Sequence, residues 1–437
     1  MKKLFTSILM AAFALTSFAG GLLTNTNQHS AFVRNPARFA TLGIDGVYFN
    51  PAGTAFLQDG FHLSANWQMI WQDRDAIDMR NNKKYEGNVY VPCMPTIMAA
   101  YKTGDWTFSG FFGMPGGGGK AEFNNGLPRF GYMAQGLIIP QLQQGFMQQT
   151  QGYGQILGTS TGSQFESTQY MFALQFGAAY KFTESFSAYA GVRANYISNN
   201  YKGSIYGELD AQVPNPQTGQ MVPYPVKHSI NVDLDQSGIA FAPIVGVDYK
   251  VGDFNFAAKY EFRAVTTVEN DTKTPEIGAV LPGFADGNTL RSDAPAMLSL
   301  AGSWQALPRL QVMAGWNYYF DKDAKVESLM GGDNMRKLSR NTLEYLFGAE
   351  YQLTDKFLVS AGIQFSNFGI NDNYTSDLAF TNDSFMTGVG GKYSLTEKVD
   401  INFGYCYANY APDNNRISQT RYERKTHNAT VGVDFRF

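Results

Sequence analysis

Apolar and polar residues alternate with a period of two along much of this chain. Between Phe357 and Phe365 every second residue is apolar, while Ser360, Gly362 and Gln364 lie between them. The runs 186–194 and 399–407 have the same pattern. Successive side chains of a β-strand point to opposite faces, so these runs predict strands with one apolar and one polar face.

Short turns bracketed by aromatic residues precede these strands. Six segments fit this description: Tyr101–Trp106, Tyr180–Phe186, Tyr249–Phe254, Trp304–Leu310, Tyr351–Phe357 and Tyr393–Val399. The connections between them are long and polar, at about 73–88, 114–166, 198–235, 266–293, 321–340, 369–381 and 411–424. Six short turns on one side and seven longer loops on the other require fourteen strands, the first at Phe61–Trp71 and the last ending at Phe437. We therefore predict an all-β fold, a transmembrane antiparallel β-barrel over residues 61–437 with short periplasmic turns.

The composition supports this class. Of the 437 residues, 44% are hydrophobic, 15% aromatic and only 16% charged, which excludes a disordered chain and fits a soluble enzyme poorly. No stretch beyond the N-terminus approaches the ~18 apolar residues of a membrane helix. Alternation with lumen residues dilutes the apolar residues of a barrel, so a barrel accounts for all of these features.

The N-terminus reads as a secretory signal over residues 1–19. Lys2 and Lys3 precede an apolar run, and Ser17–Ala19 resembles a cleavage site, so the mature chain would begin at Gly20. We expect export to the Gram-negative outer membrane. The net charge of −3 offers no basic field for nucleic acid.

The two cysteines are expected to remain free thiols. Cys93 falls on the second predicted strand and Cys406 on the thirteenth. Three strand spacings of ~4.8 Å separate them by roughly 14 Å, whereas a disulfide needs Cα atoms within about 7 Å.

Residues 20–60 precede the barrel, lack the alternation, and contain the tripeptide Asn50, Pro51, Ala52 within Phe49–Gly53. Alone, that tripeptide would more often mark an ordinary turn. The segment is too short for a separate domain, so we expect it to fold back into the lumen as a plug. In this organisation the chain resembles the long-chain fatty acid transporter (FadL/TodX) family, in which a hatch with an Asn-Pro-Ala motif precedes a fourteen-stranded barrel.

The resemblance implies a mechanism of passive uptake. Extracellular loops capture a hydrophobic molecule, the lumen binds it, and a gap beside a kinked third strand releases it sideways into the membrane. In this chain the third strand runs into Gly113, Pro115 and Gly116, and proline and glycine interrupt strand pairing. These residues are the predicted lateral gate, although they could equally mark the end of the strand.

The loop after the third strand carries a large apolar load. Phe130, Tyr132, Met133, Leu137 and Ile138 belong to it. Exposed apolar surface of this kind usually marks a binding site, so we expect the loop to capture ligand or to cover the lumen. The alternative is that it packs on neighbouring loops.

Several charges are expected to face the lumen. By alternation these are Arg193, Lys259, Glu261, Arg263, Asp400, Asp434 and Arg436. Charged side chains at membrane depth are retained only where they are paired or contribute to function. Arg193, Lys259 or Arg263 could hold a ligand carboxylate, while a paired structural network is the alternative.

The sequence offers little other chemistry. The Gly116–Lys120 run lacks the Ser or Thr of a phosphate loop, and the four histidines have no metal-ligand spacing. We expect no metal, no cofactor and no enzyme activity, and a monomer in contact with outer-membrane lipids or detergent. Two rival functions remain: a general diffusion porin, and a hydrolase at the barrel rim using His228 beside Asp233, or His427.

Overall fold

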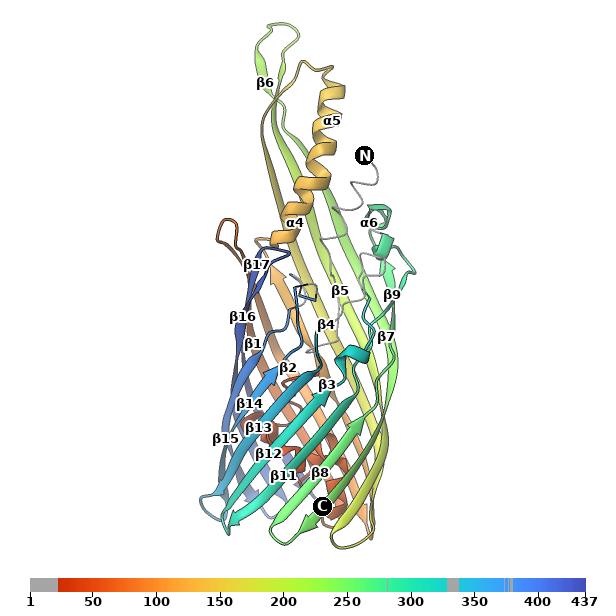
Figure 1. Cartoon of the computed structure of the whole chain (residues 1–437), viewed down its shortest axis with the longest axis vertical. Helices are drawn as coiled ribbons and strands as arrows, with labels where there is room; N and C mark the ends of the chain where they lie inside the picture. The colour runs from red at the N-terminus through yellow and green to blue at the C-terminus, as the bar shows by residue number, and fades with distance from the viewer. Residues whose placement is uncertain (1–22, 281, 328–337, 373, 376, 378–379) are drawn as a thin grey trace.

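A closed antiparallel β-barrel forms the body of the protein (Figure 1). The computed structural model describes residues 23–280, 282–327, 338–372, 374–375, 377 and 380–437; the predicted signal segment lies outside these residues. Within them fourteen strands make up the barrel wall. They are β1 Gly60–Asp78, β2 Lys83–Thr103, β3 Trp106–Phe123, β4 Gln155–Lys181, β5 Phe186–Pro214, β7 Val226–Val251, β8 Phe254–Glu261, β11 Met297–Leu307, β12 Leu310–Tyr319, β13 Thr342–Gln352, β14 Phe357–Asn367, β15 Ser384–Thr396, β16 Val399–Asn415 and β17 Thr420–Arg436. Because β1 pairs with both β2 and β17, the barrel has no free edge.

The side chains follow the predicted alternation. On β14, Ser360 and Gln364 are buried, whereas Ala361 and Phe365 are exposed. Large apolar residues such as Trp67, which is 54% exposed, cover the outer surface. Apolar residues outside and polar residues inside are the arrangement that a lipid environment requires.

The six short turns are confirmed. Each connects consecutive strands where the sequence placed it, from Thr103–Trp106 between β2 and β3 to Thr396–Val399 between β15 and β16.

The predicted loop limits are wrong on the opposite side. The segment 73–88 belongs almost entirely to β1 and β2, and most of the segments 198–235 and 411–424 is also strand. In these extensions polar and charged residues occupy both faces, as Asp73, Arg74 and Asp75 of β1 do, so the alternation of apolar and polar residues is lost although the backbone still pairs.

One wall of the barrel rises far above the rest. Strands β4, β5 and β7 extend upward in Figure 1 and are joined by the short strands β6 Met221–Pro223, β9 Thr267–Thr272 and β10 Thr289–Arg291. The helices α4 Pro128–Met133, η3 Ala134–Ile138 and α5 Ile139–Gln149 lie along this wall. The remaining short helices are α6 Pro275–Val280, η4 Pro282–Phe284 and η5 Asp321–Asp323. None of the described helices is long and apolar enough to cross a membrane.

The N-terminal segment, residues 23–59, lies inside the barrel (Figure 1). It contains the short helices α2 Ser30–Arg34, η1 Arg38–Ala40, α3 Gly46–Phe49 and η2 Pro51–Phe56. Phe32 stacks on Phe49 at 3.9 Å between ring centroids, and both belong to a buried cluster that includes Phe111 and Leu346 of the wall. The segment therefore has its own apolar attachment to the strands that surround it.

The prediction of two free thiols is confirmed. Cys93 is exposed on β2, and Cys406 is buried on β16, the thirteenth strand of the wall.

Candidate functional site

The upper lumen is lined by apolar side chains. A buried cluster joins strands β2, β3, β4, β5 and β7 to the loop helices, with partly buried residues of β1 and β3 packed against it. Its members include Val91, Met94, Phe123, Phe130, Met133, Ile138, Phe165, Met171, Ile205 and Leu234. An apolar solute that entered this region would be transferred from water at roughly 25 cal/mol per Å² of buried surface.

The loop helices contribute much of this cluster. Phe130, Met133 and Ile138 are buried, and Leu137 packs partly against the same residues. Tyr132 is 42% exposed, and its hydroxyl donates to Asp78 at 2.5 Å. The apolar residues of the loop therefore pack against the barrel wall rather than only against other loops.

The wall is interrupted beside this cluster, between β2 and β3. Their pairing runs from Thr103–Trp106 to Ile97–Phe112, lapses, and resumes at Val89–Ala121. Residues 90–96 of β2 and 113–120 of β3 have no partner across this interface. The predicted gate residues Gly113, Pro115 and Gly116 lie in this stretch. Because β3 continues to Phe123, the interruption is not the end of the strand.

Prolines on both strands explain the interruption. Pro115 of β3 faces a stretch of β2 that contains Pro92 and Pro95, and proline has no N–H to donate to the ladder. Gly117 and Gly119 have positive φ angles of 104° and 76°, which glycine adopts without strain. The β2 prolines were missed in the sequence analysis, although two prolines within a predicted strand are themselves a signal of broken pairing.

The start of the N-terminal segment contacts the interruption from inside. Gln28 donates from Nε2 to the carbonyl of Met114 at 3.0 Å, and Gln68 of β1 donates to the carbonyl of Asn27. A Cβ at Gly113 would collide with Gln28. The broken wall and the N-terminal segment are thus in direct contact.

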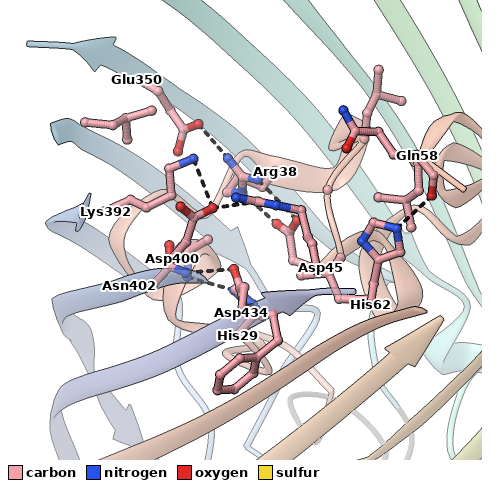
Figure 2. Close-up of a pocket in the computed structure, with 18 of the residues that line it drawn as sticks. His29, Arg38, Asp45, Gln58, His62, Glu350, Lys392, Asp400, Asn402 and Asp434 are labelled. Carbon is pink, nitrogen blue, oxygen red and sulfur yellow. Dashed lines mark hydrogen bonds and ion pairs between the residues drawn. The ribbon is translucent and has the colours of Figure 1, made fainter. Parts of the chain in front are cut away.

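Ion pairs fix the same segment to strand β13. Arg34 donates from Nη1 to Glu350 at 2.5 Å, and Arg38 bonds both Glu350 and Asp45 at 2.6 Å. A cavity of about 440 Å³ lies beside them, and His29, Lys392, Asp400 and Asp434 also line it (Figure 2). Burial acts to raise the pKa of Asp45, but the charge and hydrogen bonds of Arg38 outweigh it and hold that pKa well below its usual range.

The Asn50, Pro51, Ala52 motif is a further attachment. Asn50 donates from Nδ2 to Asp248 of β7 at 2.5 Å and to the carbonyl of Thr41 at 3.0 Å, while its Oδ1 accepts from the amide of Gly53. Pro51 begins η2, and the Ala52 carbonyl accepts from Ser187 of β5 at 2.8 Å. The motif both starts a helix and binds the wall.

Two of the proposed carboxylate contacts are already paired. Arg193 donates to Glu261 at 2.7 Å and stacks over Tyr48 at 4.5 Å, and Lys259 contacts Glu261 at 2.7 Å and the Tyr48 carbonyl at 2.9 Å. These charges join the N-terminal segment to the wall. The prediction that Arg263 shares their face is wrong: β8 ends at Glu261, the alternation stops there, and Arg263 is exposed and donates to the Asp323 carbonyl.

His228 and His427, the histidines of the hydrolase alternative, form no ion pair with a carboxylate in the described part of the chain. His228 is exposed, and His427 lies against Tyr405, whose hydroxyl is 2.6 Å from its Nδ1. No group of three or more His, Cys, Asp or Glu residues able to hold a metal is found among the described residues.

The whole chain matches one family. The model described as "Outer membrane protein transport protein (OMPP1/FadL/TodX)" matches residues 10–436. The chain belongs to this family. It is thus an outer-membrane β-barrel of a family of transporters for hydrophobic compounds, and the resemblance inferred from the sequence is confirmed.

Solved structures of the same fold support the assignment. A Pseudomonas aeruginosa FadL homologue is 16% identical with a TM-score of 0.64, covering 95% of this chain and 100% of its own. The Pseudomonas putida toluene transporter TodX is 14% identical with a TM-score of 0.59, covering 90% and 94%. The Ralstonia pickettii toluene transporter TbuX is 15% identical with a TM-score of 0.55, also covering 90% and 94%. No curated protein matches the chain.

Proposed function

We propose that this protein takes up hydrophobic compounds such as long-chain fatty acids passively, by binding them in the upper lumen and releasing them sideways into the membrane. The mature protein would comprise a hatch at residues 20–60 and the barrel at 61–437, acting as a monomer. Two structural neighbours are toluene transporters, so small aromatic hydrocarbons are the alternative substrate class.

The interruption between β2 and β3 carries the proposal. It is a stretch of wall without interstrand hydrogen bonds, and Met94 and Met114 beside it pack into the apolar cluster. A solute in that cluster could reach the membrane without crossing a row of paired backbone. The hatch lies below and blocks the straight path to the periplasm.

The loop helices are the proposed capture site. Tyr132 is exposed above the lumen, whereas Phe130, Met133 and Ile138 line it. A ligand could therefore replace the loop's own contacts with the cluster as it enters.

Glu261 already pairs with both Arg193 and Lys259, so a ligand carboxylate would compete with Glu261 for these two side chains. Replacing either with Gln would then weaken binding of an acid but not of a neutral hydrocarbon. Equal losses for both ligands would indicate the structural role instead.

The exposed thiol of Cys93 allows a direct test of lateral release. It lies in the interrupted stretch of β2, whereas Cys406 is buried, so a bulky maleimide should modify Cys93 alone. We expect uptake of a labelled fatty acid by cells carrying the protein to fall severalfold after modification, and Cys93→Ser to be insensitive. Complete modification, verified by mass spectrometry, with unchanged uptake would contradict lateral release at this site.

Two further measurements separate the proposal from a porin. The purified protein in planar bilayers should conduct little, and lipid extracted from it should contain a stoichiometric hydrophobic compound. A steady ion current with nothing bound would favour the diffusion porin.

A further inference from the structure

Two arginines face each other inside the extracellular part of the barrel. Arg74 of β1 and Arg424 of β17 are direct partners in the strand register. Arg74 lies on the inward face between buried Gln72 and Ala76, and Arg424 shares the inward face of β17 with buried Tyr422. Two positive charges thus lie side by side on the lumen wall.

Neither guanidinium has an anionic partner among the residues that the structure describes. No carboxylate lies within 4.0 Å of either group, and neither side chain makes a hydrogen bond there. Both Nε atoms are buried and unbonded. Each guanidinium stacks on a ring instead, Arg74 on Phe380 at 4.7 Å and Arg424 on Tyr410 at 4.4 Å.

This arrangement is unfavourable without a ligand. Like charges directly opposite on neighbouring strands repel, and partly buried charges without a counter-ion lose hydration that nothing replaces. Elsewhere in the lumen the arginines are paired: Arg34 binds Glu350, and Arg193 binds Glu261. We propose that Arg74 and Arg424 together bind the oxyanion head group of an acidic amphiphile.

Arginine suits this ligand. Its planar fork donates two parallel hydrogen bonds to a carboxylate, and aromatic stacking fixes the orientation of the fork. Phe380 and Tyr410 each cover a face of one guanidinium.

The surroundings favour an amphiphile over a free anion. Ile70 lies on the inward face of β1, four residues before Arg74 and about 13 Å from it along the strand. The partner of Ile70 on β2 is Val91. Met94 comes next, in the stretch of β2 where pairing with β3 lapses. An apolar tail anchored at the arginines would extend along these residues towards the interruption. This inference rests on the proposed function and adds that acidic substrates are preferred.

Equilibrium binding to the purified full-length protein tests the site. The protein is prepared in a neutral maltoside detergent, and the probes are radiolabelled oleate and the matched oleyl alcohol. The double variant Arg74→Gln/Arg424→Gln is compared with Arg421→Gln, which removes an outward-facing charge of the same strand that is paired with Glu423 at 2.6 Å. The thermal midpoint of each variant is measured alongside.

We expect the double variant to bind oleate at least about tenfold more weakly, since charge-assisted hydrogen bonds are lost. Its affinity for oleyl alcohol should change less than twofold, its thermal midpoint should stay equal or rise, and Arg421→Gln should bind both probes normally. Equal losses for the two probes, or no loss, would overturn the site while leaving transport intact. Competition by millimolar inorganic phosphate as strong as by oleate would indicate a free-anion site and overturn the amphiphile assignment. If the unaltered protein bound neither lipid, the proposed function itself would fail.

Discussion

The attachment of the hatch through Glu350 can be tested with one substitution. Glu350 of β13 accepts from Arg34 at 2.5 Å and from Arg38 at 2.6 Å, and the side chains of Arg34 and Glu350 are 2% and 7% exposed. In Glu350→Gln, Arg38 keeps Asp45, but Arg34 loses the one carboxylate that it contacts among the described residues and retains Ser360 and Asn402. The variant therefore leaves the buried guanidinium of Arg34 without its ion-pair partner.

The expected cost follows from the burial of that charge. Removing one partner of a buried ion pair destabilises by about 3–5 kcal/mol, and the two remaining neutral acceptors place this case near 3 kcal/mol. Each 1.4 kcal/mol is a factor of ten, so the population of protein with a released hatch should rise about 100-fold. The strands of the wall keep their interstrand hydrogen bonds, so the barrel should persist.

Native-state hydrogen exchange in detergent measures this directly. Amides of residues 23–59 should exchange about 100-fold faster, while β13 and β14 keep their protection. Glu184→Gln is the matched control, because Glu184 pairs with Lys181 on an exposed turn and its loss should leave exchange unchanged. Acceleration below tenfold, or an equal acceleration in β13, would refute the reasoning that this ion pair holds the hatch specifically.

Three further outcomes are expected. Asn50→Asp would place a second carboxylate against Asp248, so it should release the hatch more at pH 7 than Asn50→Ala does, by limited proteolysis within residues 23–59. The pKa of Asp45 lies below its usual range, so its contribution to stability is present above about pH 4 and is lost as the pH falls further; proteolysis of the hatch should therefore rise below pH 4 and stay constant from pH 5 to 8. Tyr132→Phe removes the hydroxyl that holds the loop helices to β1, and should speed hydrogen exchange in residues 128–149 about tenfold, whereas wild-type rates would show that packing alone holds them.

The membrane-spanning part of the fold could be predicted from the sequence, because lipid outside and polar contacts inside impose a strict alternation. The same alternation correctly predicted that Arg193 and Lys259 point into the lumen. It failed at Arg263, since facing can be extrapolated only while the strand continues and β8 ends two residues earlier.

The extracellular parts of the strands could not be predicted from the alternation, and the reason is physical. There both faces of a strand carry polar and charged residues, so the alternation of apolar and polar residues disappears while the backbone pairing continues. Arg74 and Arg424 lay in segments expected to be loops, and their opposition became evident only from the strand register. The Asn-Pro-Ala motif pointed to the N-terminal segment, but its bond to Asp248 joins residues 198 positions apart. No local pattern predicts such a contact.

The lumen is divided into two levels of opposite character, and this division favours release through the wall. Above the hatch an apolar solute contacts residues such as Val91, Met94 and Met171. Below that level it would have to displace buried ion pairs such as Arg34–Glu350, whose charges would lose partners they cannot recover from an apolar molecule. Under the proposed function, continuing downward would therefore cost several kcal/mol, whereas leaving through the interruption would require only displacement of the Gln28 contact with Met114. In the proposed function the hatch would thus act as an energetic barrier as well as a steric one, and substitutions at Glu350 should increase ion leakage without increasing the uptake of a hydrophobic substrate.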